Sequence, residues 1–203
     1  MDSKNAPGHF YLMNFTENSY YQEKFEHFSL TDMVLKQKSY EECEFIGVSL
    51  IGCKFEKSKF LNCKFIECVL SAVVPVDCNL NGVSFIGSKV IGVDWTKVEK
   101  IRDLEFNKSQ INFSSFRLLA LPRIKIVKCE SKEVDFTETD LSHGDLKGTD
   151  FEKSRFFKTN LTYADLRGAK NYYIDARVNT LKQTRFSLPE ALSLLNGLDI
   201  ILE

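Results

Sequence analysis

The chain has 203 residues, and its 27 basic and 28 acidic side chains give a formal net charge of −1. Direct nucleic-acid binding asks for a basic face and DNA mimicry for a strongly acidic one, so this balance favours neither. No apolar run approaches the ~18–20 residues of a membrane-spanning helix. Residues 1–13 lack a basic segment followed by an apolar core, so we expect a cytoplasmic protein with no membrane partner.

An apolar or aromatic residue recurs at every fifth position from Phe10 to Trp95, and only Pro75 breaks the series. An α-helix repeats at three and four residues and a flat strand at two, so a strict period of five predicts a repeat architecture. The series resumes at Ile101 and runs to Leu166, shifted by a single residue. One residue is therefore inserted between Trp95 and Ile101.

The other positions of the five-residue unit are also regular. Two residues before the large residue, the side chain is nearly always small or β-branched. Two residues after it, glycine recurs at seven places. This second position predicts a turn that needs backbone freedom.

The A(D/N)LXX unit of the pentapeptide-repeat proteins is matched letter for letter by residues 164–168, with close variants at residues 139–141, 149–151 and 159–161. The chain resembles this family, which includes the bacterial Qnr and MfpA types, over residues 8–170. The resemblance implies an all-β fold, a right-handed quadrilateral β-helix of about eight coils with one pentapeptide on each side. The large and small positions would point inward. Residues one coil apart would stack in columns, such as Phe25, Phe45, Phe65, Phe85 and Phe106.

All six cysteines occupy the small inward position: Cys43, Cys53, Cys63, Cys68, Cys78 and Cys129. Free cysteine fills such a position as a small hydrophobe, and the spacings do not match a CxxC zinc pair. Cys43 and Cys63 would stack one coil apart, within disulfide range. Without a secretion signal we expect both to stay reduced.

Two features of the first half interrupt the regular pattern. Residues 1–7 are expected to form a lead-in before the first coil. Pro75 lacks a backbone N–H, so we expect one inter-coil hydrogen bond to be absent and a local bulge or corner near Val73–Asp77.

The phase break between Thr96 and Arg102 forms a short charged stretch. A single inserted residue forms a bulge, and bulges often re-aim side chains at binding sites. The candidate partner-binding residues are Lys97, Glu99, Lys100 and Arg102. Structural tolerance of the extra residue explains the break equally well. Further along, Asp135, Asp140, Asp145 and Asp150 precede four successive large residues, as the family pattern implies for structural reasons.

Residues 171–203 leave the repeat and predict a C-terminal capping helix and tail. Ser187 and Glu190 form a capping box, apolar residues follow at helical spacing, and Gly197 is placed to end an α-helix. Residues 198–202 predict a short apolar strand. An open β-helix end exposes unpaired backbone, so the helix should cover it. The resemblance also implies a homodimer through this element, with a capped monomer as the alternative. The dimer residues would be Leu192, Leu195, Leu198, Ile200 and Ile201.

The sequence contains no phosphate-cradling glycine loop, no HExxH motif and no convergent Ser/His/Asp or Cys/His set. We therefore expect a protein that is not an enzyme, with no catalytic residues, no cofactor and no metal. The resemblance to the Qnr and MfpA types implies a DNA-shaped rod that binds DNA gyrase or topoisomerase IV and protects it from quinolones or toxins. The alternative is a general interaction scaffold with an unknown protein partner and no topoisomerase activity.

Overall fold

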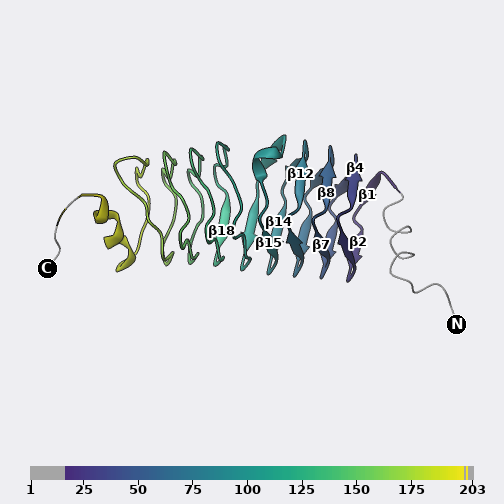
Figure 1. Cartoon of the computed structure of the whole chain (residues 1–203), viewed down its shortest axis with the longest axis horizontal. Coiled ribbons are helices and arrows are strands. Elements are labelled where there is room, and N and C mark those ends of the chain that lie inside the picture. Colours follow the sequence, from purple (N-terminus) through teal and green to yellow (C-terminus); the bar gives the residue numbers. More distant parts are fainter. Residues whose placement is uncertain (1–16, 199, 201–203) are drawn as a thin grey trace.

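The computed structural model describes residues 17–198 and residue 200, so the predicted lead-in of residues 1–7 lies outside the described residues. Short strands wind into a rod, and the coils stack side by side along its length (Figure 1). The strands form four parallel sheets, one for each face of the rod. The all-β quadrilateral solenoid inferred from the sequence is confirmed.

Each face is built from three-residue strands. Face 1 consists of β1 (Ser19–Tyr21), β5 (Ser39–Glu41), β9 (Lys59–Leu61), β13 (Asn79–Asn81) and β16 (Lys100–Arg102). Face 2 consists of β2 (Lys24–Glu26), β6 (Glu44–Ile46), β10 (Lys64–Ile66), β14 (Ser84–Ile86), β17 (Glu105–Asn107) and β18 (Lys125–Val127). Face 3 consists of β3 (Ser29–Thr31), β7 (Ser49–Ile51), β11 (Val69–Ser71) and β15 (Lys89–Ile91). Face 4 consists of β4 (Val34–Lys36), β8 (Lys54–Glu56) and β12 (Val74–Val76).

The large inward residue of each strand stacks on that of the strand one coil away. On face 2, Phe45 pairs with Phe65, and their ring centroids are 4.5 Å apart. The column continues across the phase break, where Phe85 pairs with Phe106 at a centroid distance of 5.1 Å. Each stacked aromatic pair contributes ~0.5–1.5 kcal/mol beyond the burial of its area. The predicted phenylalanine column is confirmed.

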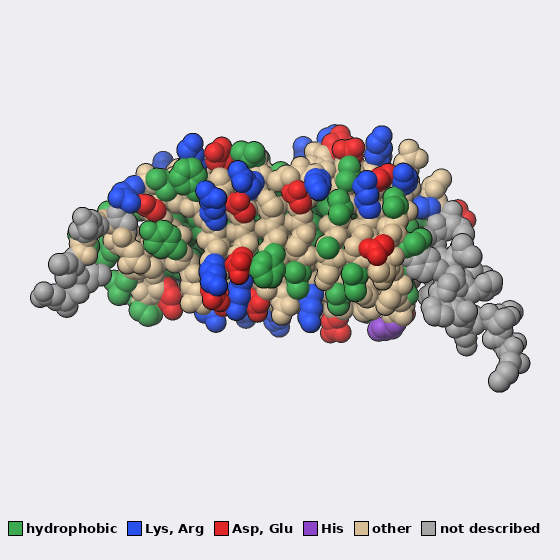
Figure 2. Space-filling model, viewed as in Figure 1, with side chains coloured by type: hydrophobic (Ala, Val, Ile, Leu, Met, Phe, Trp, Pro, Cys, Tyr) green, Lys and Arg blue, Asp and Glu red, His purple; other side chains and the backbone are tan. Residues whose placement is uncertain are grey.

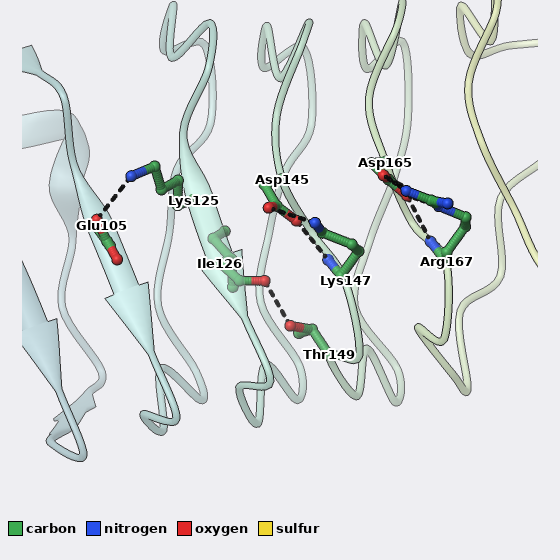
Figure 3. A network of polar contacts seen from close by, with 8 residues as sticks. All are labelled: Glu105, Lys125, Ile126, Asp145, Lys147, Thr149, Asp165 and Arg167. Carbon is green, nitrogen blue, oxygen red and sulfur yellow. Dashed lines mark hydrogen bonds and ion pairs between the residues drawn. The ribbon is translucent and has the colours of Figure 1, made fainter.

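The small inward residues form hydrogen bonds with the backbone of the preceding coil. All six cysteines are free and buried, as predicted. The Cys63 thiol lies 3.4 Å from the carbonyl oxygen of Tyr40, and burial raises the pKa of Cys63 to about 12. Thr149 occupies an equivalent position and donates its hydroxyl to the Ile126 carbonyl at 2.6 Å (Figure 3), while accepting the N–H of Cys129 at 3.2 Å. These groups fill the lumen and satisfy buried backbone atoms, which would otherwise destabilise the fold.

The second half of the rod winds by turns rather than strands. The largest of the four sheets has six strands, fewer than the predicted count of about eight coils. Beyond the strands, isolated β-bridges continue the winding as far as the bridge between Asp165 and Arg185. In this half, aspartate precedes the large residue and accepts a hydrogen bond from the N–H two residues later, as Asp135 does from Thr137 at 2.9 Å. Such an Asx turn bends the chain locally. Each side of these coils therefore pairs with the neighbouring coil through a single residue, as an isolated β-bridge. The recurring aspartates are structural.

Pro75 forms no bulge, and of the two predicted alternatives near Val73–Asp77 only the corner is present, at Asp77, where φ is 52°. Pro75 lies in β12 and pairs in register with Phe55. On face 3, the equivalent N–H of Val90 donates to Gln110 of the next coil at 2.7 Å. Proline lacks this donor, and the face 4 sheet ends at β12. The next winding replaces a strand with the 3-10 helix η2 (Trp95–Lys97), so the irregularity falls one coil after the proline.

The C-terminal element is the 3-10 helix η3 (Glu190–Leu198) rather than an α-helix. Ser187 does not form the predicted capping box, because its hydroxyl accepts the N–H of Gly168 at 2.8 Å and ties the segment to the repeat. Gly197 lies inside η3 and does not end it. Leu194 packs against the core, and Figure 1 places η3 at the C-terminal end of the rod. Most of the predicted 198–202 strand lies outside the described residues.

The corner position two residues after each large residue has a positive φ in almost every unit. Gly92 has a φ of +69° and open space where a Cβ would lie. We predict that Gly92→Ala lowers the free energy of unfolding by ~1–2 kcal/mol, because an L-residue in this region brings its Cβ against the following carbonyl. Urea denaturation measures the loss. Gly92→Asn should lose less, because asparagine tolerates this region; equal losses in both variants would contradict the explanation.

Candidate functional site: an interrupted ladder at the phase break

The inserted residue is accommodated in η2 on face 4. The Asp94 carboxylate accepts hydrogen bonds from the Thr96 N–H at 3.1 Å and the Thr96 hydroxyl at 2.6 Å, which closes the helical turn. Trp95 stays buried and stacks on Phe116, with ring centroids 5.7 Å apart. The core therefore continues through the break, and only the backbone path on the surface changes.

The backbone ladder opens on face 1 immediately after η2. The N–H groups of Glu99 and Lys100 both donate to the Cys78 carbonyl, at 3.0 and 3.2 Å, which holds this segment on the preceding coil. Within residues 17–198, no backbone hydrogen bond joins residues 99–103 to residues 119–123. On the neighbouring face the ladder is closed, because the Lys125 N–H donates to the Leu104 carbonyl at 3.2 Å. The interruption therefore ends before face 2.

The next coil shows what face 1 normally contains. There the N–H groups of Leu121 and Arg123 donate across the coils to Asp140 and Ser142, both at 2.8 Å. The N–H of Asp140 returns a bond to the Leu119 carbonyl at 2.9 Å. The corresponding bonds are missing one coil earlier, between residues 99–103 and 119–123.

Three adjoining hollows lie along this interruption, and we refer to them together as the face 1 groove. The largest has a volume of about 520 Å³ and is lined by Ile101, Arg102, Asp103, Leu104, Ala120, Leu121, Pro122, Arg123, Ile124 and His143. A second, of about 290 Å³, extends along residues 98–102 and 119–121. A third, of about 300 Å³, lies between residues 82–84, 103–105, Arg123 and Lys125. Ile101 and Leu119 are only partly buried, although they pack against the core.

Charged and aromatic side chains mark one corner of the groove. Asp103, Arg123, His143 and Tyr163 occupy the same corner position in successive coils, each with a positive φ. The imidazole of His143 stacks on the Tyr163 ring, with centroids 4.9 Å apart and an interplanar angle of 18°. Arg102 and Arg123 line the largest hollow, and neither forms an ion pair within residues 17–198. The groove therefore offers two unpaired guanidinium groups beside an interrupted backbone ladder.

Comparison with known families decides the classification. A family model described as a pentapeptide repeat region matches residues 38–116, and one described as pentapeptide repeats (8 copies) matches residues 135–170. Together these segments span more than half of the chain. The chain belongs to the pentapeptide-repeat family. No curated protein matches its sequence.

Solved structures share the fold of this pentapeptide-repeat protein. One trypsin-treated form of QnrB1, described as a plasmid-mediated fluoroquinolone resistance protein, is 17% identical and has a TM-score of 0.76 over 91% of this chain and 98% of that chain. A second trypsin-treated form is 18% identical, with a TM-score of 0.64 over 91% and 97%. HetL, from the cyanobacterium Nostoc and involved in heterocyst differentiation regulation, is 13% identical with a TM-score of 0.39 over 89% and 94%. At identities of 17% and 18%, the likeness to the two QnrB1 forms shows the fold alone.

The structure brings together three of the four predicted bulge residues. Glu99, Lys100 and Arg102 line the groove, whereas Lys97 lies outside it and pairs with Asp94 at 3.8 Å. Sequence reasoning did not place Arg123 and His143 in the site. The coil length is the signal that finds them. Arg123 occupies the same corner as Asp103, the residue after Arg102, but one coil later, and His143 occupies it one coil later still.

The predicted dimer residues lie on or beside η3. Leu192, Leu198 and Ile200 are exposed, Leu195 is partly buried, and Ile201 lies outside the described residues. Apolar side chains are therefore available at the C-terminal end of the pentapeptide-repeat rod. The structure contains a single copy of the chain, so the dimer stays a prediction.

Elsewhere on the rod, acidic and basic side chains pair between coils. Glu44 lies 3.1 Å from Lys64 and 3.5 Å from Lys24, and the hydrogen bond from Lys64 lowers the pKa of Glu44. On the same face, Lys125 pairs with Glu105 at 3.1 Å (Figure 3). Figure 2 shows basic and acidic side chains interspersed over the visible face. The described residues contain neither a cluster of three or more potential metal ligands nor a helix long and apolar enough to cross a membrane.

One ion pair supports the irregular segment between the repeats and η3. The Arg177 side chain donates to the Asp175 carboxylate at 2.7 and 3.0 Å, and the Arg177 backbone N–H donates at 2.9 Å. These bonds lower the pKa of Asp175 to about 2. Because the charged form is favoured in the folded state, the resulting stability is present above the ordinary aspartate pKa of ~3.9 and is lost as the pH falls towards 2.

We predict that Asp175→Asn lowers the melting temperature at neutral pH and that this difference disappears as the pH falls through the window from ~4 to 2. Asparagine keeps the backbone hydrogen bond of the Asx turn but removes the charge. Thermal unfolding followed by circular dichroism from pH 7 to 2 measures the effect. A difference that persists unchanged at pH 2 would show that the charge on Asp175 does not contribute.

Proposed function

We propose that this pentapeptide-repeat scaffold is a cytoplasmic protein-binding rod that does not act as an enzyme. The observation that carries the proposal is a pair of exposed apolar corners in one coil. Phe113 and Leu118 are 60% and 68% exposed and lie on either side of face 4. Their φ values are 60° and 61°, a region that bulky residues rarely adopt.

Neither side chain contributes to the core, and both occupy a backbone conformation that costs free energy. Nearly every corner of the rod requires this conformation, so the fold accounts for the backbone here but not for two exposed apolar side chains. Glycine or asparagine would satisfy these corners at lower cost. Exposed apolar groups on a rigid, flat-sided rod support contact with another protein.

We further propose a type II topoisomerase, DNA gyrase or topoisomerase IV, as the first partner to test. Two observations support it: the family resemblance, and the likeness over nearly the whole chain to a fluoroquinolone resistance protein. Mimicry of DNA by a continuous acidic face is not favoured, because carboxylates along the rod, such as those of Glu44, Glu56, Glu105 and Asp150, each lie beside a lysine. Contact through the apolar corners fits the surface better.

A supercoiling assay tests this partner. We expect micromolar rod to change DNA supercoiling by gyrase or to restore it in the presence of a quinolone. The double variant Phe113→Asn and Leu118→Asn should lose this effect while becoming more stable in urea, because asparagine tolerates the corner conformation. The exposed pair Lys57→Gln and Lys59→Gln serves as a surface control.

Each other outcome removes one part of the proposal. No effect on either topoisomerase at micromolar rod would exclude the topoisomerase and leave a scaffold with another protein partner. An effect that survives in the double variant would place the contact elsewhere on the rod. Lower stability of the double variant would show that the corners are structural.

We also propose that the rod is a homodimer joined through η3 and its neighbouring residues. Light scattering after size exclusion should give twice the 23.3 kDa chain mass. The variant Leu192→Glu with Leu198→Glu should elute as a monomer, because it places charges in an apolar contact. Ile51→Glu, at an exposed position on face 3, should leave the dimer intact. A wild-type monomer at micromolar concentration would exclude the dimer.

A further inference from the structure

We propose that the face 1 groove binds an extended acidic segment of a protein partner, whose backbone completes the interrupted ladder beside residues 99–103. This inference rests on the proposed protein-binding function and names the surface and the chemistry of the partner. It is distinct from the contact proposed for Phe113 and Leu118, which lie outside the groove lining.

Backbone pairing is available because β16 is bonded along one edge only. Its other edge faces residues 119–123 without a backbone hydrogen bond. The equivalent N–H groups of the next coil, those of Leu121 and Arg123, all pair across the coils. An unpaired strand edge is a template for an added strand, and such addition supplies main-chain hydrogen bonds regardless of sequence. The groove thus offers a strand edge within the length of the rod.

Charge selects an acidic segment. Arg102 and Arg123 line the largest hollow without ion pairs, and His143 lies at the same corner. Asp103 is the one carboxylate lining that hollow, whereas Glu99 in the adjoining hollow lies 4.0 Å from Lys100. Guanidinium groups present a fork of donors that matches a carboxylate. Carboxylates on the incoming segment would therefore meet donors that the rod leaves unused.

The groove is of suitable size and has an apolar floor. A volume of about 520 Å³ lies within the range of ligand pockets. Ile101, Leu121 and Ile124 contribute apolar surface beneath the charged corner. In an extended segment alternate side chains point to opposite sides. The geometry therefore favours a segment in which acidic residues alternate with β-branched or aromatic ones.

An unbiased selection tests this inference. A phage library of random peptides of about twelve residues, long enough to add one strand, is selected on the full-length protein. Enriched peptides are then measured by fluorescence polarisation. We expect alternating acidic and apolar sequences whose affinity falls about tenfold or more in Arg102→Gln with Arg123→Gln, since bidentate arginine–carboxylate bonds are lost. Lys57→Gln with Lys59→Gln, which removes the same charge elsewhere, should leave the affinity unchanged.

A second measurement reports backbone pairing. Amide hydrogen exchange of Ile101, Asp103 and Ala120 should slow when a selected peptide is bound, because an added strand protects these groups. N-methylation of alternate peptide bonds should abolish binding while leaving the side chains in place. The inference is overturned if selection enriches no peptide, if enriched peptides lack acidic residues, or if they bind the double arginine variant as tightly as the wild type.

The outcome separates the groove from the wider function. If the rod binds a topoisomerase or another protein equally well with both arginines replaced, the groove proposal fails and the protein-binding function stands. If no partner protein binds the rod but acidic peptides still compete for the groove, the groove stands and the proposed partner fails. Circular dichroism of the double variant confirms that its coils remain folded.

Discussion

The fold depends on in-register hydrogen bonding between neighbouring coils. Each coil must place its donors and acceptors against those of the coils on either side, so every residue inherits its environment from the residue one coil away. The stacking of Phe45 on Phe65 is one consequence. The positive φ at the corners is another, because the chain must turn after each short side. The charge pairs between coils, such as Lys64 with Glu44, follow from the same stacking.

Features that follow from the five-residue period were predictable from the sequence. The phenylalanine column and the buried thiols are set by position within the unit, and the corner glycines mark a backbone conformation that needs no knowledge of neighbouring coils. No bulge forms at Pro75 because the proline pairs in register with Phe55 of the preceding coil and lacks only the donor towards the following one. The capping box at Ser187 failed for a related reason: Gly168, distant in sequence, occupies the hydroxyl.

The groove was predictable only in part. The inserted residue identified Glu99, Lys100 and Arg102, because they follow the break directly in sequence. Arg123 and His143 approach the same hollow from later coils. Finding them requires the coil length, the single-residue shift and the knowledge that the ladder opens along face 1. The last of these depends on the backbone path after η2, where two N–H groups share the Cys78 carbonyl, and no local pattern encodes it.

The open ladder also divides the molecule energetically. In a solenoid, stability is close to a sum of terms for each repeat and each interface between neighbours. The interface that lacks its face 1 bonds is weaker than those on either side, so thermal or mechanical unfolding that starts at one end meets a natural stopping point there. The coupling between the two halves of the rod is therefore lowest beside residues 99–103, and a partner that binds across the gap would strengthen it.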